Sequence, residues 1–343
     1  MKILFLSLKE EGYSRTWTYF TSLQSQGADC EFLRLNRGSI WRNLKIAKKS
    51  GKGISNRIVI GSASQLLVIP SILVFKTRPF LDAGWSLFES TIVNRTRAGK
   101  FHEKAIKAYL IDFVATIFSR KVFLESKLQV AWYKNIFFVR KEKCITLYTG
   151  LDESEFMPEN VSKTKSETSF KVVFRGKNND EAGLEILAQA TKILADDDID
   201  FEVISNMDQS ELNFSERTKV ISKFYKSKNS IASVLAAADL SLGQLSNHTR
   251  LSRTIPHKAF ESAFLGIPYL TARNSGILEI FQENEEIFCF DSGSAEDLVA
   301  KIRFLKSNRS RLEKSGKKLK EKYSERLSQK ILAQQLMGII RNS

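Results

Sequence analysis

The sequence of 343 residues has few of the residue types that build disulfide frameworks and metal sites. Its three cysteines lie far apart without paired spacing, which excludes a disulfide framework and a zinc ribbon and indicates a reducing compartment. Its three histidines stand singly, with no His/Cys cluster, so the sequence predicts no metal site. The apolar run Ile3–Leu6 is too short for a signal-peptide core, and we expect a cytoplasmic protein.

Long hydrophobic runs are also scarce. The best candidate for a membrane span, residues 58–75, is interrupted by Gly61, Pro70 and several polar residues. This pattern is typical of a strand, a turn and a second apolar element. Hydrophobic residues make up 43% and charged residues 27% of the chain, which is a globular balance and excludes full disorder. The length predicts two domains.

Positive charge is concentrated at the two ends of the chain. The net charge is +15, to which residues 1–160 contribute +11, residues 301–343 contribute +10 and residues 161–300 contribute −6. The densest early cluster mixes cations with Trp41, Leu44 and Ile46, a composition suited to an anionic membrane surface. A solvated helix face is the alternative, whereas a nucleic-acid binder would more often spread cations and stacking aromatics over its main domain. The cations of this cluster are Arg42, Lys45, Lys48, Lys49, Lys52 and Arg57.

Strand and helix patterns alternate along both halves of the chain. The first half begins with a buried strand, a short loop, a helix and a second strand, which indicates a parallel α/β sheet. The polar, turn-rich residues 151–169 mark a domain boundary, and the alternation restarts at residues 171–176. The sequence therefore predicts two doubly wound Rossmann-like domains facing a cleft, with ligands at the carboxyl ends of the strands and a helical tail.

The most informative stretch is residues 253–268. Pro256 is well placed as the first residue of a helix, which Gly266 ends before the next strand. Lys258 and Glu261, three residues apart, share a face near the helix start. A carboxylate there can accept both hydroxyls of a ribose, and an ammonium beside a helix N-terminus can hold a diphosphate. The alternative is an ordinary surface ion pair.

Three segments together resemble a known family. The order of Lys258, Glu261, Gly266 and Pro268 followed by residues 274–279 is similar to the C-terminal half of retaining glycosyltransferases of family 4 (group 1), which have the GT-B fold. Residues 148–158 resemble the linker before the donor domain of that family. The similarity extends to residues 174–177 and 182–183 and covers most of residues 144–340.

The resemblance implies a site for a nucleotide sugar in the second half. Glu261 would bind the ribose, and Lys177 and Arg175 beside Gly176 would neutralise the diphosphate. The backbone N–H groups of Ser275 and Gly276 would approach the phosphate or the sugar, and the base would lie near residues 221–224. The family's usual second glutamate is replaced by Arg253, so we expect Arg253 and Lys258 to take over phosphate contacts. No cofactor is implied beyond the donor substrate.

The first half carries weaker candidates for the same reaction. The loop after the first strand would bring Gly12 towards the donor phosphates, with an ordinary turn as the alternative. Residues 82–85 resemble a loop at the end of a strand, and Asp82 would orient the acceptor hydroxyl or the transferred sugar, with a turn aspartate as the alternative. His102 lies at a helix start, as a capping or surface residue would, so the family's cleft histidine has no counterpart in this chain.

The implied activity is a metal-independent transfer of a sugar, with retention, from a nucleotide-diphosphate sugar to an acceptor hydroxyl. We expect a glycan or lipid-linked acceptor in polysaccharide, lipopolysaccharide or glycolipid synthesis, at the inner face of a membrane. Residues 1–160 would bind the acceptor, residues 161–325 would bind the donor, and a helix at residues 326–343 would return to the N-terminal domain. The alternatives are a nucleotide-sugar epimerase of the same fold and a noncatalytic basic protein that binds nucleic acid.

Overall fold

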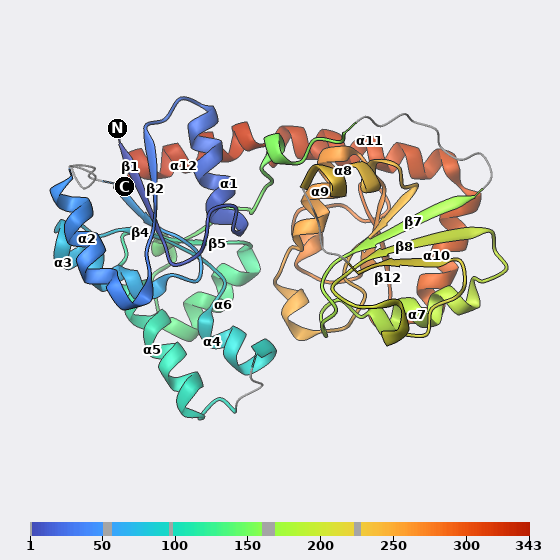
Figure 1. Cartoon of the computed structure of the whole chain (residues 1–343), viewed down its shortest axis with the longest axis horizontal. Helices are drawn as coiled ribbons and strands as arrows, with labels where there is room; N and C mark the ends of the chain where they lie inside the picture. Colours follow the sequence, from blue (N-terminus) through green and yellow to red (C-terminus); the bar gives the residue numbers. More distant parts are fainter. Residues whose placement is uncertain (1, 51–56, 96–98, 160–168, 223–227) are drawn as a thin grey trace. The chain divides into compact units, whose positions relative to one another are not determined.

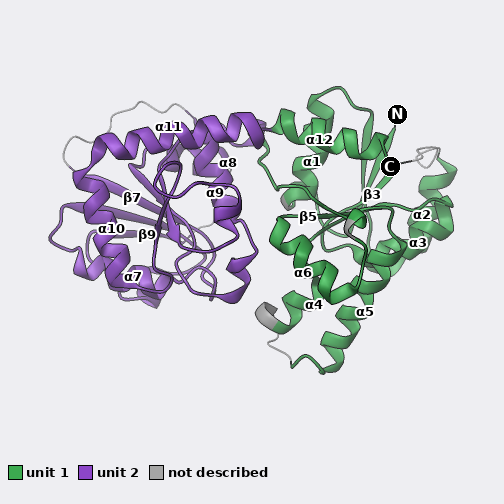
Figure 2. Cartoon of the chain, turned by 180° about the vertical axis from the view of Figure 1, so that it is seen from behind, with its two compact units in different colours: residues 1–152, 329–343 green, residues 153–328 purple. Residues whose placement is uncertain are grey.

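The computed structural model of the chain describes residues 2–50, 57–95, 99–159, 169–222 and 228–343. Its internal contacts divide it into two compact units, shown in Figure 2. Unit 1 comprises Met1–Asp152 and Gln329–Ser343, and unit 2 comprises Glu153–Ser328. The sequence places the boundaries at residues 160 and 325, whereas these contacts place them at Asp152 and Ser328.

Unit 1 is built on a parallel sheet with the strand order β2-β1-β3-β4-β5-β6 (Figure 1). Because β1 pairs with both β2 and β3, the strand order reverses between β1 and β3, which makes this the switch point of the sheet. The strands are β1 (Ile3–Ser7), β2 (Cys30–Arg34), β3 (Arg57–Ile60), β4 (Phe80–Gly84), β5 (Val122–Leu124) and β6 (Cys144–Thr146).

Helices cover both faces of this sheet. Successive side chains of β1 point to opposite faces, so Ile3 and Phe5 join one core and Leu4 and Leu6 join the other. The C-terminal helix packs against α1 in the first of these cores, where Leu336 is fully buried. The helices of unit 1 are α1 (Ser14–Ser25), α2 (Ile40–Lys49), α3 (Val68–Phe75), α4 (Leu87–Glu89), α5 (Glu103–Phe118), α6 (Lys127–Phe137) and α12 (Gln329–Arg341).

Unit 2 repeats this design with the strand order β12-β11-β10-β7-β8-β9. The chain builds outward from β7 to β9 and then returns to the other side of β7 with β10, so the switch point lies between β7 and β10. The strands are β7 (Phe170–Arg175), β8 (Ile199–Ile204), β9 (Thr218–Ile221), β10 (Leu240–Leu242), β11 (Tyr269–Ala272) and β12 (Phe288–Phe290).

The helices of unit 2 pack tightly around its sheet. Gly316 of α11 lies against the turn that ends α9, where a Cβ on Gly316 would come within 2.4 Å of the Gly266 carbonyl oxygen. Only glycine allows this close approach of α11 to the end of α9. The helices are α7 (Leu184–Ile193), α8 (Lys228–Ala236), α9 (His257–Leu265), α10 (Ala295–Ser307) and α11 (Arg309–Arg326).

The two doubly wound sheets confirm the predicted fold class, while two local predictions are wrong. Residues 72–75, expected as part of a second apolar element, lie in helix α3. Asp82 lies inside strand β4 and is fully buried, because this part of the chain extends the sheet beside β5 where a loop was expected. Pro256 is the N-cap residue of α9, and the helix begins at His257. No described helix is both long and apolar enough to cross a bilayer.

Candidate functional site

Polar side chains gather at the switch point of unit 2. Open parallel sheets bind ligands outside the carboxyl ends of their strands where the strand order reverses. In unit 2 this edge is formed by Arg175 at the end of β7, by the loop after β10 and by the first turn of α9, which follows that loop. The structure thus brings together four of the predicted site residues: Arg175, Gly176, Lys258 and Glu261.

Glu261 is the central acidic group of this cluster. Its side chain is 1% exposed, and its Oε1 atom pairs with the Arg175 guanidinium and lies 3.2 Å from His257 Nδ1. Across the described parts of the chain, no group is hydrogen-bonded to its Oε2 atom. Burial works to raise the pKa of Glu261, but Arg175 and His257 outweigh it and hold the pKa below its usual value. The carboxylate is therefore ionised, with one oxygen held and the other buried without a hydrogen bond from the described residues.

Lys258 lies beside this carboxylate but is held by other groups. Its Nζ atom is 3.2 Å from the Gly243 carbonyl oxygen and 3.9 Å from the centre of the Phe174 ring. Burial and then the nearby charge of Arg175 lower the pKa of Lys258 well below its usual value, although Glu261 opposes them. An anion bound here would favour the charged ammonium, so diphosphate binding and protonation of Lys258 would be coupled. Both residues are buried, which rules out the ordinary surface ion pair considered from the sequence.

Glycines let the two loops of the cluster approach these side chains. A Cβ on Gly176 would lie 2.9 Å from Lys258 Nζ, and a Cβ on Gly243 would lie 2.3 Å from Thr271 Oγ1. At Gly276 it would come within 2.5 Å of the Thr254 carbonyl oxygen, so the loop after β11 rests directly on the segment that leads into α9. The absence of a side chain at Gly276 is therefore a packing requirement.

The other candidates predicted in unit 2 lie around this cluster. Lys177 and Ser275 are exposed, each next to one of the buried glycines, and Arg253 is half-buried just before α9. Within the segment expected near the base, Ile221 ends β9, while residues 223 and 224 lie outside the described residues. In the described ranges, no three His, Cys, Asp or Glu side chains are grouped so as to hold a metal ion.

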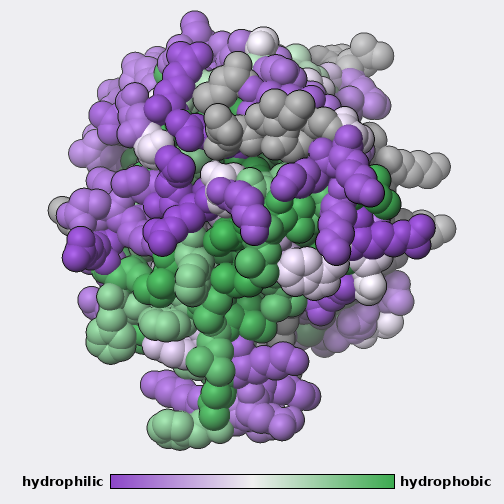
Figure 3. All heavy atoms as spheres, turned by 90° about the vertical axis from the view of Figure 1, so that its left-hand side faces the viewer, coloured by the Kyte–Doolittle hydropathy of each residue, from purple (hydrophilic) through white to green (hydrophobic). Residues whose placement is uncertain are grey.

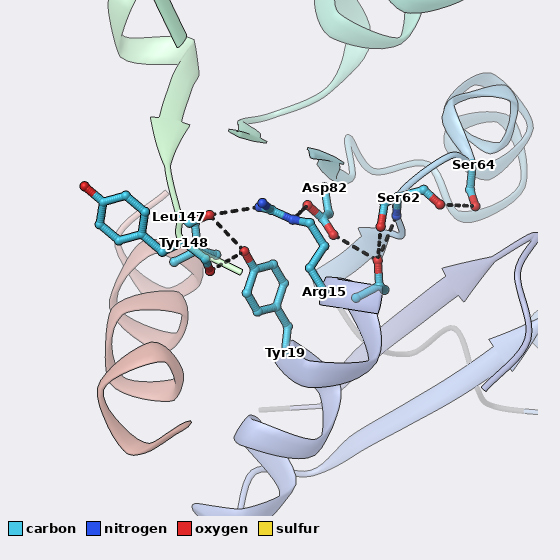
Figure 4. A network of polar contacts seen from close by, with 8 residues as sticks. Arg15, Tyr19, Ser62, Ser64, Asp82, Leu147 and Tyr148 are labelled. Carbon is cyan, nitrogen blue, oxygen red and sulfur yellow. Dashed lines mark hydrogen bonds and ion pairs between the residues drawn. The ribbon is translucent and has the colours of Figure 1, made fainter. Parts of the chain in front are cut away.

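In unit 1 the structure places Asp82 within a network of polar contacts (Figure 4). Both carboxylate oxygens are engaged: Oδ1 accepts a hydrogen bond of 2.7 Å from Arg15 Nε, and Oδ2 accepts one of 2.9 Å from Thr16 Oγ1. Arg15 also donates to the Leu147 carbonyl oxygen, so the network ties helix α1 to β4 and to the segment after β6. This arrangement makes Asp82 a positioning residue of unit 1.

The same network closes the switch point of the sheet in unit 1. Thr16 Oγ1 lies 2.8 Å from Ser62 Oγ, and a Cβ on Gly61 would meet Thr16 Cγ2 at 2.8 Å. Further along the loop after β3, Ser64 Oγ accepts a hydrogen bond of 2.9 Å from Leu8 N. The loops after β1 and β3 are therefore joined by the protein's own side chains. Gly12, in the loop after β1, is exposed and takes a left-handed backbone conformation (φ 77°).

Two functional groups escaped prediction from the sequence. His257 stands four residues before Glu261, a spacing that places both on one helix face, whereas the pair predicted from the sequence was Lys258 and Glu261. Arg15 carried no signal, because its partner Asp82 is remote in the sequence and meets it only once the sheet is formed. His102 is the N-cap residue of α5, as expected, and its Nδ1 accepts a hydrogen bond from Lys104 N.

Comparisons with known proteins agree with this architecture. Residues 184–338 match the family model of glycosyl transferase-like proteins. The structure of HepE from Anabaena, solved in complex with UDP, superposes with a TM-score of 0.74 at 14% identity, and all of both chains is covered. A glycosyltransferase from Rickettsia africae gives 0.74 at 13% identity, covering 99% of this chain and 98% of its own. The sucrose-phosphate synthase of Thermosynechococcus elongatus gives 0.73 at 11% identity, covering 100% and 99%.

These similarities establish the fold. Two parallel sheets of six strands with flanking helices match the two-domain, Rossmann-like GT-B fold of these structures. No curated protein sequence is detectably similar to the chain.

Proposed function

We propose that the protein is a glycosyltransferase that binds a nucleotide-diphosphate sugar at the switch point of unit 2. The observation that carries this proposal is the buried, ionised carboxylate of Glu261, which has one oxygen held by Arg175 and His257 and the other without a hydrogen-bond partner among the described residues. Burying a charged oxygen without a partner is costly unless a ligand supplies one. A ribose supplies two adjacent hydroxyl donors for such an oxygen.

The cations around Glu261 suit the diphosphate of the same ligand. Lys258 lies in the cluster, Lys177 is exposed beside Gly176, and Arg253 precedes α9. Their charges would stabilise the negative charge that develops on the diphosphate as it departs from the sugar. Lys258 and Glu261 lie within residues 184–338, the part that matches the glycosyl transferase-like family, and Arg175 lies shortly before it.

The finer parts of the proposal rest on the sequence. The resemblance to family 4 supports transfer with retention and without a metal ion, and it assigns the acceptor to unit 1. An acceptor glycan or lipid-linked glycan at the inner face of a membrane fits the strongly basic N-terminal sequence. UDP-glucose is the first donor to test, because HepE has been solved in complex with UDP-glucose.

A thermal-shift panel of UDP-, GDP- and ADP-sugars tests donor binding on the full chain. A ligand at about 100 times its dissociation constant stabilises a protein by about 2.7 kcal/mol, which corresponds to about 5–10 °C for a domain of this size. We expect one nucleotide class to stabilise the parent protein, and Glu261→Gln to weaken binding about 10- to 100-fold through loss of charge-assisted hydrogen bonds. No stabilisation by any nucleotide sugar would refute the proposal.

A pair of exposed lysines provides a matched test of the diphosphate contact. Lys177→Ala should weaken binding of UDP while leaving the weaker binding of uridine unchanged, because only UDP carries the charge that Lys177 meets. Lys192 is also an exposed lysine, on α7 of the same unit, so Lys192→Ala serves as the control. If both variants lose the same affinity for UDP, the loss comes from the lower overall positive charge, which would contradict a specific contact between Lys177 and the diphosphate.

A further inference from the structure

The net positive charge of the protein comes entirely from unit 1. Its sequence contains 27 Lys or Arg and 11 Asp or Glu, a net charge of +16, whereas unit 2 contains 26 and 27, a net charge of −1. Within unit 1, residues 32–81 contain ten Lys or Arg and no Asp or Glu. Such a one-signed stretch attracts anionic partners from a distance and repels a second copy of itself.

A band of apolar side chains lies exposed on the same unit. Ile106, Leu110 and Ile117 of α5 are four and seven residues apart, so they fall on one face of the helix, and Leu110 is 53% exposed. The opposite face of α5 is buried in the unit through Ala105, Ala108 and Ala115, among others. Helix α5 therefore carries apolar side chains on its outer face as well as on its inner face.

The band continues from α5 onto its neighbours. Helix α5 packs against α3 and against the short 3-10 helix Gln65–Leu67 that precedes α3, and both expose a leucine: Leu66 and, at 51%, Leu73. Figure 3 looks onto the side of the molecule that lies on the left in Figure 1, where α2 and α3 are labelled, and shows a continuous green, hydrophobic area with hydrophilic groups around it. We call this surface, made by Leu66, Leu73, Ile106, Leu110 and Ile117, the apolar band.

Cations flank the apolar band. Helix α2, which packs against α3, exposes Arg42, Lys45 and Lys49 together with the apolar side chains of Trp41 and Ile46. Of the four carboxylates in the described part of residues 57–118, Glu103 alone is exposed. Lys52 of the predicted cluster lies outside the described residues.

We infer that this face of unit 1 docks on the surface of an anionic lipid bilayer, with the apolar band in the headgroup–acyl boundary and α2 against the headgroups. Aliphatic side chains surrounded by cations are the composition of an interfacial membrane contact, in which buried apolar area and attraction to anionic lipids add together. Nucleic acid would leave the leucines and isoleucines without a partner, and a second copy would bring two strongly positive units together. This inference rests on the proposed function, because docking on the bilayer would hold the enzyme beside a lipid-linked acceptor.

Vesicle flotation of the full chain without any nucleotide sugar tests this inference separately from the proposed function. We expect the protein to float with vesicles of equal parts phosphatidylcholine and phosphatidylglycerol and to remain unbound with phosphatidylcholine alone. Failure to bind the anionic vesicles at low salt would overturn the inference while leaving donor binding, measured by thermal shift, untouched. Loss of donor binding with intact flotation would refute only the proposed function.

Variants separate the two contributions to docking. Leu73→Ser with Leu110→Ser should lower the partition coefficient about tenfold, since each removes exposed apolar area that the bilayer would cover. Lys45→Glu with Lys49→Glu should lower it at least about tenfold, through loss of attraction and added repulsion. Both pairs are exposed, so unchanged circular dichroism and melting would show that the variants fold.

Controls come from equivalent side chains of unit 2. Ile193 on α7 is 47% exposed and Lys317 on α11 is exposed, so Ile193→Ser and Lys317→Glu should leave flotation unchanged. If the control variants lose as much binding as those of unit 1, or if the leucine variants bind like the parent, the assignment to the apolar band is wrong. Dimerisation in ultracentrifugation that Leu110→Ser abolishes would show instead that a second copy covers this face and would overturn the inference.

Discussion

Replacing Asp82 with asparagine would leave the buried Arg15 guanidinium of unit 1 without the carboxylate to which it is hydrogen-bonded. The two side chains are 0% and 1% exposed, and their closest atoms are 2.7 Å apart. Asparagine has nearly the same volume, so the variant creates no cavity and isolates the effect of the charge. Arg15 also donates a hydrogen bond to the Leu147 carbonyl oxygen, lies 5.0 Å from the centre of the Tyr19 ring and is attracted by the nearby charge of Glu125.

The expected cost follows from this burial. Breaking a buried ion pair by neutralising one partner destabilises a protein by about 3–5 kcal/mol. For a unit of this size, each kcal/mol shifts the melting temperature by about 2–4 °C, so Asp82→Asn should lower it by about 6–20 °C. Adding Arg15→Met should recover a large part of the loss, because the guanidinium that has lost its hydrogen-bonded carboxylate is then removed from the interior.

Urea unfolding followed by tryptophan fluorescence measures these losses, and donor binding to unit 2 is measured on the same variants below their unfolding transition. We expect Asp82→Asn to unfold at lower urea while binding the donor nucleotide as the parent does. A loss of stability below about 1 kcal/mol would refute the assignment of Asp82 to a buried positioning pair. A double variant less stable than Asp82→Asn alone would refute the electrostatic explanation of the loss.

Two further substitutions have defined outcomes. Burial raises the pKa of Asp112 to about 7, although hydrogen bonds from Phe88 N and Ser86 Oγ oppose the shift. Between about pH 4 and about pH 7, the folded chain therefore keeps a proton on Asp112 that the unfolded chain has released. The free energy of unfolding consequently falls as the pH rises through this range. In urea unfolding, the free energy of unfolding of Asp112→Asn should decline over this pH range by up to about 4 kcal/mol less than that of the parent. Equal declines in the variant and the parent would contradict this prediction. Gly276→Ala should lower stability by about 1–3 kcal/mol, because its Cβ would press on the Thr254 carbonyl; an unchanged melting temperature would show that the loop is free to move.

The fold could be predicted from the sequence because its signals are local. Buried strands such as Ile3–Ser7 are short apolar runs, and the helices between them begin and end at recognisable residues, as Ser294 does when its Oγ accepts a hydrogen bond from Asp297 N. The sequence predicted an apolar element at helix α3 without deciding between helix and strand, because its residues are apolar almost throughout and show neither period. Asp82 was mistaken for a loop residue because a buried aspartate in a strand is explained only by its distant partner Arg15.

The candidate site was predictable only in part, for the same reason. The helix spacing brought Lys258 and Glu261 to one face, but the sequence could not show which groups hold them. Arg175 reaches Glu261 from the end of another strand, and Lys258 is directed to the Gly243 carbonyl. Contacts between segments far apart in the sequence depend on strand order, which the alternating pattern alone leaves open.

A crystal structure of the full chain with UDP-glucose is the most direct test of the account. We predict the nucleotide at the edge between β7 and β10 of unit 2, with the ribose hydroxyls donating to Glu261 Oε2 and the diphosphate beside Gly176 and Lys258. A nucleotide bound at the switch point of unit 1, or at any site that leaves Glu261 Oε2 without contact, would contradict the central claim.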